Sequence, residues 1–259
     1  MFKLAKNKYL ATGSKHTKLV VHANLEQGQN NVGERLSDII LGGQDGLVNT
    51  LGVILGIAAA SSDFRIVVAG GLAGAIAEAV SMGAVGYTSE VAARDYYLSQ
   101  LHKEEQEIDE IPLAEKQEIR DIYEKKGFKG QLLEDIVDGI TSDRQVWLET
   151  MMQQELKLVP VEDGRPLRAA FVIGMSAFVG SMIPLAPFVL FYVFNPKFEN
   201  GMHIAMYIVL VLSALVLFVV GVVKSNITVG KWYKSGLQMA VIGIVSALFG
   251  YLVGMLFSV

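Results

Sequence analysis

Residues 66–109 read IVVAGGLAGAIAEAVSMGAVGYTSEVAARDYYLSQLHKEEQEID, and this stretch decides the fold class of the chain. Its first half, Ile66–Tyr87, is 22 residues long and contains one ionisable side chain, that of Glu78. A helix of about 20 apolar residues crosses a hydrocarbon core, so this half predicts a transmembrane helix. The second half is polar and contains neither proline nor glycine before Pro112. We therefore expect one long helix that leaves the membrane and continues in water to about Asp109.

Four further stretches have the same apolar character. They are Ile39–Ala60, Ala169–Phe194, Met202–Val223 and Ser235–Val259. The third span contains Pro184 and Pro187, which should kink it. Apolar residues make up 52% of the chain and charged residues 19%, against about 45–50% and about 25% in soluble domains. The sequence thus predicts an all-α membrane protein with five transmembrane helices.

Small residues recur four residues apart in the first two spans. Gly42 and Gly46 form one such GxxxG pair, and Gly52 and Gly56 form another. Such pairs allow helix backbones to approach closely. They support a close contact of the first two spans, but they do not identify the partner helix.

The basic residues predict the orientation of the spans, because cytoplasmic segments carry more Lys and Arg. Residues 1–36, 88–168 and 224–234 hold 20 of the 22 Lys and Arg residues. We therefore expect a cytoplasmic N-terminus and a C-terminus that lies outside or in a lumen. No apolar run precedes Ile39, so we expect no cleavable signal peptide.

The composition excludes several classes of protein. The absence of Cys rules out disulfides, thiolate metal sites and a cysteine nucleophile. A net charge of −4 argues against nucleic acid as a partner. The chain contains no HExxH, GxSxG, Walker A or ExxH motif, so we expect neither an enzyme nor a prosthetic group.

The polar insert between the second and third spans is acidic and helical. Residues 88–168 contain 19 Asp and Glu against 11 Lys and Arg. Beyond the long helix we expect helices over Leu113–Lys126, Gln131–Ile140 and Asp143 to about Leu158, the last capped by Thr141 or Ser142. The chain then divides into a basic cytoplasmic segment (1–36), spans one and two (37–87), an acidic cytoplasmic domain of three to four helices (88–166) and spans three to five (167–259).

Two carboxylates at membrane depth require an explanation, because an unpaired charge there is costly. Asp45 lies in the first span, and Glu78 and Met82 lie one turn apart on one face of the second. Two carboxylate oxygens and a thioether suit a divalent transition metal better than Ca²⁺ or Mg²⁺. These three residues therefore predict a translocation path. Alternatively, the carboxyl groups are protonated or hydrogen-bonded inside the bundle, and Met82 only packs.

The insert repeats the same ligand chemistry on three helices. The candidate metal ligands form pairs three or four residues apart and are Glu104 and Glu107, Glu115 and Glu118, and Met151 and Glu155, with Met152 beside them. Each pair lies on one helix face, so the three helices together predict a pocket for a divalent metal. Solvated helices are also rich in Glu, which is the alternative for each single pair. This alternative does not account for Met151 and Met152, because two adjacent residues of a helix do not both face the same core.

Several segments resemble the vacuolar iron transporter (VIT) family. GGQDGLVNT at 42–50 is similar to its first span, and GGLAGAIAEAVSMGAVGY at 70–87 to its second. EVAARDYYLSQLHKEEQEI resembles the helix that enters the family's cytoplasmic metal-binding domain, and WLETMMQQEL the helix that closes it. The similarity covers roughly residues 33–195, and the last two spans match in length and position.

The resemblance implies export of Fe²⁺ from the cytosol by proton antiport in a homodimer. It implies translocation-path roles for Asp45 and Met82 and ligand roles for the Glu and Met residues of the insert. The family often has a carboxylate where Gly74 stands here, and Glu78, one turn later on nearly the same face, is the candidate to replace it. The substrate is expected to be Fe²⁺, with Mn²⁺, Co²⁺ and Zn²⁺ as further cargo. The membrane would be vacuolar in a eukaryote and the plasma membrane in a prokaryote.

Two alternatives belong to other functional classes. The first is a passive channel for divalent cations, which could not drive a metal uphill. The second is a membrane-anchored iron-storage or ferroxidase protein, against which the missing ExxH pairs argue.

Overall fold

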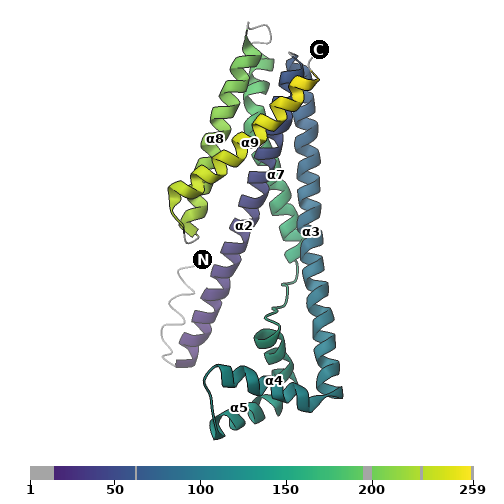
Figure 1. Cartoon of the computed structure of the whole chain (residues 1–259), viewed down its shortest axis with the longest axis vertical. Coiled ribbons are helices and arrows are strands. Elements are labelled where there is room, and N and C mark those ends of the chain that lie inside the picture. The colour runs from purple at the N-terminus through teal and green to yellow at the C-terminus, as the bar shows by residue number, and fades with distance from the viewer. Residues whose placement is uncertain (1–14, 62, 195–199, 228–229, 258–259) are drawn as a thin grey trace. The chain divides into compact units, whose positions relative to one another are not determined.

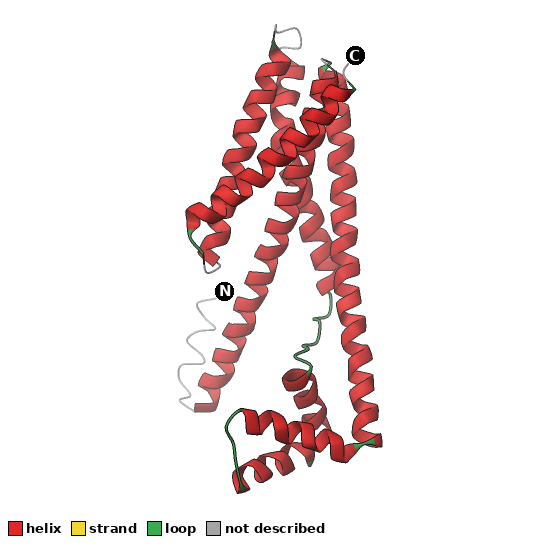
Figure 2. Ribbon diagram, in the orientation of Figure 1, coloured by secondary structure: helices red, strands yellow, loops and turns green. Residues whose placement is uncertain are grey.

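The computed structural model describes residues 15–61, 63–194, 200–227 and 230–257, and within these ranges every regular element is a helix (Figures 1 and 2). The described helices that are long and apolar enough to cross a membrane are α2 (Lys15–Ala60), α3 (Phe64–Glu110), α7 (Arg165–Phe194), α8 (Gly201–Ile227) and α9 (Trp232–Leu256). This confirms the five predicted spans. Residues 1–14 of the expected basic N-terminal segment lie outside the described residues.

The helix bounds differ from the predicted ones mainly at the ends. α2 begins at Lys15, well before the apolar stretch that starts at Ile39. α3 is one continuous helix from the apolar segment to Glu110, as its sequence predicts, and Ile111 precedes the proline that begins the next helix. Pro184 and Pro187 both lie inside α7 without ending it.

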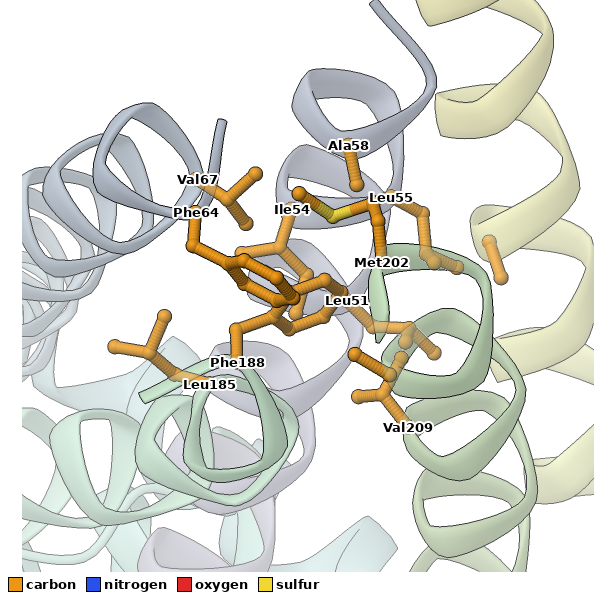
Figure 3. Packing of buried hydrophobic residues seen from close by; sticks show 12 residues of the cluster. Leu51, Ile54, Leu55, Ala58, Phe64, Val67, Leu185, Phe188, Met202 and Val209 are labelled. Atoms are coloured by element: carbon orange, nitrogen blue, oxygen red, sulfur yellow. The ribbon is translucent and has the colours of Figure 1, made fainter. Parts of the chain in front are cut away.

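The chain forms two compact units. One, which we call the membrane unit, comprises residues 1–85 and 169–259, and the other, the acidic unit, comprises residues 86–168. The membrane unit has an apolar core to which α2, α3, α7 and α8 contribute (Figure 3). Phe64, the first residue of α3, stacks on Phe191 with 5.9 Å between ring centroids and also contacts Phe188. This core fixes the start of α3 against α2, and α2 and α3 carry the carboxylates at membrane depth.

Glycines of α2 determine which helices pack against it. A Cβ atom on Gly46 would lie 2.0 Å from the carbonyl oxygen of Ala177 on α7. A Cβ atom on Gly254 of α9 would lie 2.0 Å from the carbonyl oxygen of Gly56. Backbones therefore touch at both crossings, and only glycine fits there. The partners of these GxxxG pairs are α7 and α9, which the sequence pattern alone does not identify.

The acidic unit contains the polar end of α3, α4 (Pro112–Lys125), α5 (Gln131–Thr141), α6 (Arg144–Thr150) and the π-helix η1 (Met151–Glu155). α4 and α5 match their predicted ranges. The predicted N-cap of α6 was wrong, because Thr141 and Ser142 belong to the end of α5. Asp143 caps α6 instead, and its Oδ1 accepts hydrogen bonds from the backbone N–H groups of Gln145 and Val146.

Apolar contacts and ion pairs hold the acidic unit together. Its core contains Ile108, Ile119, Leu133, Val137, Trp147 and Met151. Ion pairs join neighbouring helices around this core, with 2.6 Å between Lys116 and Asp138 and 2.7 Å between Arg144 and Asp109. Arg165 at the start of α7 binds Glu90 of α3 at 3.0 Å. This ion pair joins the first and last segments of the acidic unit, and the packed helices position the glutamates that lie between them.

Candidate functional site

The carboxylates at membrane depth lie together in the membrane unit. Asn49 Nδ2 of α2 donates a hydrogen bond to Glu78 Oε1 of α3 at 3.0 Å. The carboxyl group of Asp45, one turn earlier on α2, interacts with both Glu78 and Asn49. Met82 follows Glu78 by one turn of α3 and is half-buried. Asp45 and Glu78, which lie in separate spans, are therefore brought into one group.

Open space adjoins this group. Asn49 and Glu78 line an open cavity of about 860 Å³ that α9 borders with residues such as Ser246 and Gly250. They also line a smaller cavity of about 260 Å³, together with Gly74 and Ser81 of α3. A cation or a water molecule therefore has room beside the carboxyl group of Glu78.

Three glutamates of the acidic unit converge, one from each of three helical elements. Glu104 of α3, Glu115 of α4 and Glu155 of η1 each offer a carboxylate oxygen, and these oxygens all lie within 4.8 Å of one another. We call these three residues the carboxylate cluster. Glu104 is 2% exposed and Glu115 is 3% exposed, whereas Glu155 is exposed. The cluster thus has a buried side and an open side.

Two oxygen atoms of the cluster lack a hydrogen-bond partner. Oε2 of Glu104 and Oε2 of Glu115 are both buried and receive no hydrogen bond from the described residues. Buried polar atoms are normally paired, and unpaired carboxylate oxygens are especially costly because they carry charge. A divalent cation between the three carboxylates would satisfy both atoms. The arrangement therefore fits a metal ligand set of hard oxygen atoms.

A π-helix explains the burial of two adjacent methionines. In η1 the N–H of Leu156 donates to the carbonyl of Met151 at 3.2 Å, which is the wider i to i+5 pattern. Met151 and Met152 are 0% and 1% exposed. Of the two, Met151 belongs to the apolar core of the acidic unit, as far as the described residues define it. Both methionine side chains are thus buried in the π-helical turn that also brings Glu155 to the cluster. π-bulges of this kind are frequent at functional sites.

Glu107 and Glu118 surround the cluster without belonging to the group within 4.8 Å. The carboxylate of Glu118 accepts a hydrogen bond from the protonated carboxyl group of Glu155. Glu107 pairs with Lys103 Nζ at 3.2 Å, one turn away on α3. The structure therefore brings all five predicted glutamates to one region but gives them different partners. Lys103, which was not among the predicted site residues, is the basic side chain of α3 that lies next to these glutamates.

The like charges of this region change its protonation. Burial raises the pKa of Glu115 to about 7, and the charges of Glu118, Glu104 and Glu107 act in the same direction. Desolvation of its carboxyl group, the hydrogen bond that protonated Glu155 donates to Glu118 and the charge of Glu118 raise the pKa of Glu155 to about 7. Protons therefore remain on this group at a pH where an ordinary glutamate has lost them. A bound metal has to displace them.

These pKa values predict that the metal-free acidic unit becomes less stable as pH rises. The pKa of Glu115 is 4.5 for a free side chain and about 7 in the folded protein, so the folded state binds the proton more tightly. The stability that this proton contributes is complete below about pH 4.5 and is lost between pH 4.5 and 7. For Glu115 the loss is on the order of 3 kcal/mol.

Trp147 fluorescence measures this effect, because Trp147 lies in the core of the acidic unit. The other tryptophan, Trp232, is replaced by Phe in all samples. Thermal unfolding in the presence of a chelator should occur at a lower temperature at pH 8 than at pH 5. Glu115→Gln should reduce this difference, with the remainder due to Glu155, whereas Glu124→Gln on the exposed side of α4 should retain all of it. An equal pH dependence in both variants would contradict the assignment to Glu115.

Asn49 is the residue of the membrane group that the sequence analysis missed. Its side chain carries no charge, so Asn49 is not among the ionisable residues that stand out in the apolar spans. The available signal was its position four residues after Asp45, which puts both side chains on one face of α2.

Comparison with known proteins identifies the family. The model of the VIT family matches residues 36–255, which is most of the chain. The chain belongs to the VIT family. A relative named vacuolar iron transporter 2 from Oryza sativa subsp. japonica is 36% identical over 83% of this chain and 84% of its own length. Vacuolar iron transporter 1 from Eucalyptus grandis is 33% identical over 83% of each chain.

The match extends beyond plants. A vacuolar iron transporter from Plasmodium falciparum (isolate 3D7) is 31% identical over 85% of this chain and 81% of its own length. The matched region includes both units of the structure. This VIT-family chain is therefore a transporter of metal ions embedded in the membrane by several spans, and not an enzyme.

Proposed function

We propose that this chain moves Fe²⁺ out of the cytosol in exchange for protons. The observation that carries the proposal is the carboxylate cluster. Its three glutamates each offer an oxygen atom within 4.8 Å of the other two, and two of these glutamates are buried. The names of the relatives, which are called vacuolar iron transporters, support iron as the cargo. Mn²⁺, Co²⁺ and Zn²⁺ are further candidates, because oxygen and thioether ligands do not select iron by affinity alone.

The carboxylate cluster is proposed to collect the metal from the cytosol. Glu104, Glu115 and Glu155 supply hard oxygen ligands, while Glu107 and Glu118 add negative charge around them. Met151 and Met152 are proposed as soft ligands beside Glu155, a combination that suits a borderline divalent cation. The acidic unit carries 19 Asp and Glu against 11 Lys and Arg, so its field attracts divalent cations.

Asp45, Glu78 and Met82 are proposed to form the translocation path within the membrane. The interaction of Asp45 with Glu78 supports this role, because two carboxyl groups that share one site exchange protons for a divalent cation. Protons that enter from the outer side would compete with the metal for the same oxygen atoms. This competition couples metal exit to proton entry. We further propose that two copies of the chain form a homodimer around this path.

The proposed orientation follows the distribution of basic residues. The N-terminus and the acidic unit face the cytosol, and the C-terminus lies outside or in a lumen. In a eukaryote the membrane would be that of the vacuole, which agrees with the names of the relatives. In a prokaryote it would be the plasma membrane.

Transport in proteoliposomes tests the exchange. We expect Fe²⁺, kept reduced with ascorbate, to accumulate against its own gradient in the compartment that is made acidic, because protons leave that compartment in exchange. Dissipation of the pH gradient with a protonophore should stop the accumulation. Downhill flux that ignores the imposed pH gradient would instead favour the passive channel. Oxygen consumption that depends on Fe²⁺ would favour the storage or ferroxidase alternative.

A further inference from the structure

Asn49 is a polar side chain in an otherwise apolar stretch of α2, and it hydrogen-bonds to Glu78. It lies on α2 four residues after Asp45, within the span that runs from Ile39 to Ala60. Its Nδ2 atom donates to Glu78 Oε1 on α3 at 3.0 Å, and the same side chain interacts with Asp45. One neutral amide thus contacts both carboxyl groups of the proposed translocation path.

An amide group has a chemical property that neither a carboxylate nor an apolar side chain has. Its nitrogen carries two N–H donors, and its oxygen accepts hydrogen bonds or binds a cation. While no metal is present, the N–H groups hold acceptor oxygens of the two carboxyl groups close together. A carbonyl oxygen is also an ordinary ligand of divalent cations. Rotation about the bond between Cβ and Cγ exchanges the two ends of the amide.

The space around Asn49 allows this exchange. Asn49 and Glu78 line both the cavity of about 860 Å³ and the cavity of about 260 Å³. Val53, one turn further along α2, and Gly74 on α3 share the smaller cavity with them. A Cβ atom on Gly74 would have Val53 as its neighbour at 4.0 Å, so the wall opposite Asn49 is not crowded. A cation has room to enter beside the amide.

We propose that Asn49 is a further functional residue of the translocation path, which holds Asp45 and Glu78 together in the metal-free protein and offers its amide oxygen to the passing cation. The inference rests on the function proposed above for Asp45 and Glu78. It assigns Asn49 both a positioning role and a ligand role. The cation is a divalent transition metal, which accepts both oxygen and thioether ligands.

The alternative is a purely structural role, in which the hydrogen bond from Asn49 only fastens α2 to α3. The two roles differ in what they change. A structural bond affects the amount and stability of folded protein, whereas a residue of the path affects the concentration of metal at which transport is half-maximal. Transport kinetics therefore separate them when each variant is also measured for stability.

The experiment compares substitutions at Asn49 in the full-length protein in proteoliposomes, with Fe²⁺ kept reduced with ascorbate as the cation. Asn49→Leu retains the shape of the side chain and removes both donor and acceptor. We expect KM for Fe²⁺ to rise about tenfold, the usual value of a hydrogen bond to a charged group, with an unchanged unfolding temperature. Asn49→Asp retains an oxygen ligand and should keep KM near that of the parent while lowering the maximal rate, because a third negative charge slows release.

Val53→Ala serves as the matched control, because Val53 lines the same cavities without a polar atom. It should leave KM unchanged. An unchanged KM in Asn49→Leu, with only a loss of folded protein, would overturn the proposal. If Asn49→Leu does not fold, Asn49→Ser is tested for the same rise in KM, since its hydroxyl group is too short to reach Glu78. Normal transport by Asp45→Ala would instead refute the proposed path itself, whatever the result at Asn49.

Discussion

Replacement of Asp45 by alanine is expected to reduce Fe²⁺ transport by at least about a hundredfold, the largest effect of any single change in the membrane unit. A dication at membrane depth without a compensating carboxylate meets a barrier of several kcal/mol, and each ~1.4 kcal/mol is a factor of ten. Glu78 alone cannot compensate, because one carboxylate balances only one of the two positive charges of the cation. Uptake of Fe²⁺ into proteoliposomes, normalised to inserted protein, measures the effect.

Gln44→Ala is the matched control for this prediction. Gln44 precedes Asp45 on α2 but lines a different, apolar cavity together with Ser176 and Gly180 of α7. Its loss should leave the rate of transport close to that of the parent protein. Binding of Fe²⁺ by the acidic unit should be equal in both variants, since neither residue belongs to that unit. Transport by Asp45→Ala at the parental rate would remove Asp45 from the path.

The second large effect is expected at Glu104. Glu104→Gln should weaken binding of Fe²⁺ by the acidic unit at least about a hundredfold. Removal of a residue that only hydrogen-bonds to a metal ligand already lowers metal affinity about 10–100-fold, and removal of a ligand itself should cost more. The same change should stabilise the metal-free protein, since it removes a buried charge with an unpaired oxygen atom next to Glu115. Opposite effects on metal binding and on stability are the signature of a site built for a cation.

Calorimetric titration of the full-length chain with Fe²⁺ under anaerobic conditions measures the affinity. All samples carry Asp45→Ala, so that binding within the membrane does not contribute to the heat. Glu124→Gln removes the same charge from an exposed position of α4 and should change the affinity only slightly. Equal affinities in the two variants would favour the alternative that the glutamates are only a solvated helix surface.

The spans and the long helix α3 were predictable because their signals are local. A run of about 20 apolar residues predicts a transmembrane helix whatever surrounds it, and the lack of proline and glycine between Tyr87 and Pro112 predicts its continuation. The N-cap of α6 was not predictable in this way. Thr141, Ser142 and Asp143 are all good capping residues, and only the end of α5 decided that Asp143 caps the helix.

The acidic site was predictable in composition but not in its internal arrangement. Glu104, Glu115 and Glu155 each stand three or four residues from a second candidate ligand, and this spacing places the two residues of each pair on one helix face. Which oxygen atoms then share a pocket depends on how three helical elements pack. The pairing of Glu107 with Lys103 and the bond between Glu118 and Glu155 follow from that packing. Their roles as metal ligands stay predictions for the experiments above.

The sequence by itself determined the class of this protein, namely five apolar spans, an acidic helical insert and the residue types available to bind a metal. Hydrophobic periodicity and charge are properties of neighbouring residues, so they can be interpreted without a fold. Only the tertiary structure decided that Asn49 bonds to Glu78, that the glycines of α2 contact α7 and α9, and that a π-helix buries both Met151 and Met152. These features depend on contacts between distant segments, and such contacts arise only when the helices pack.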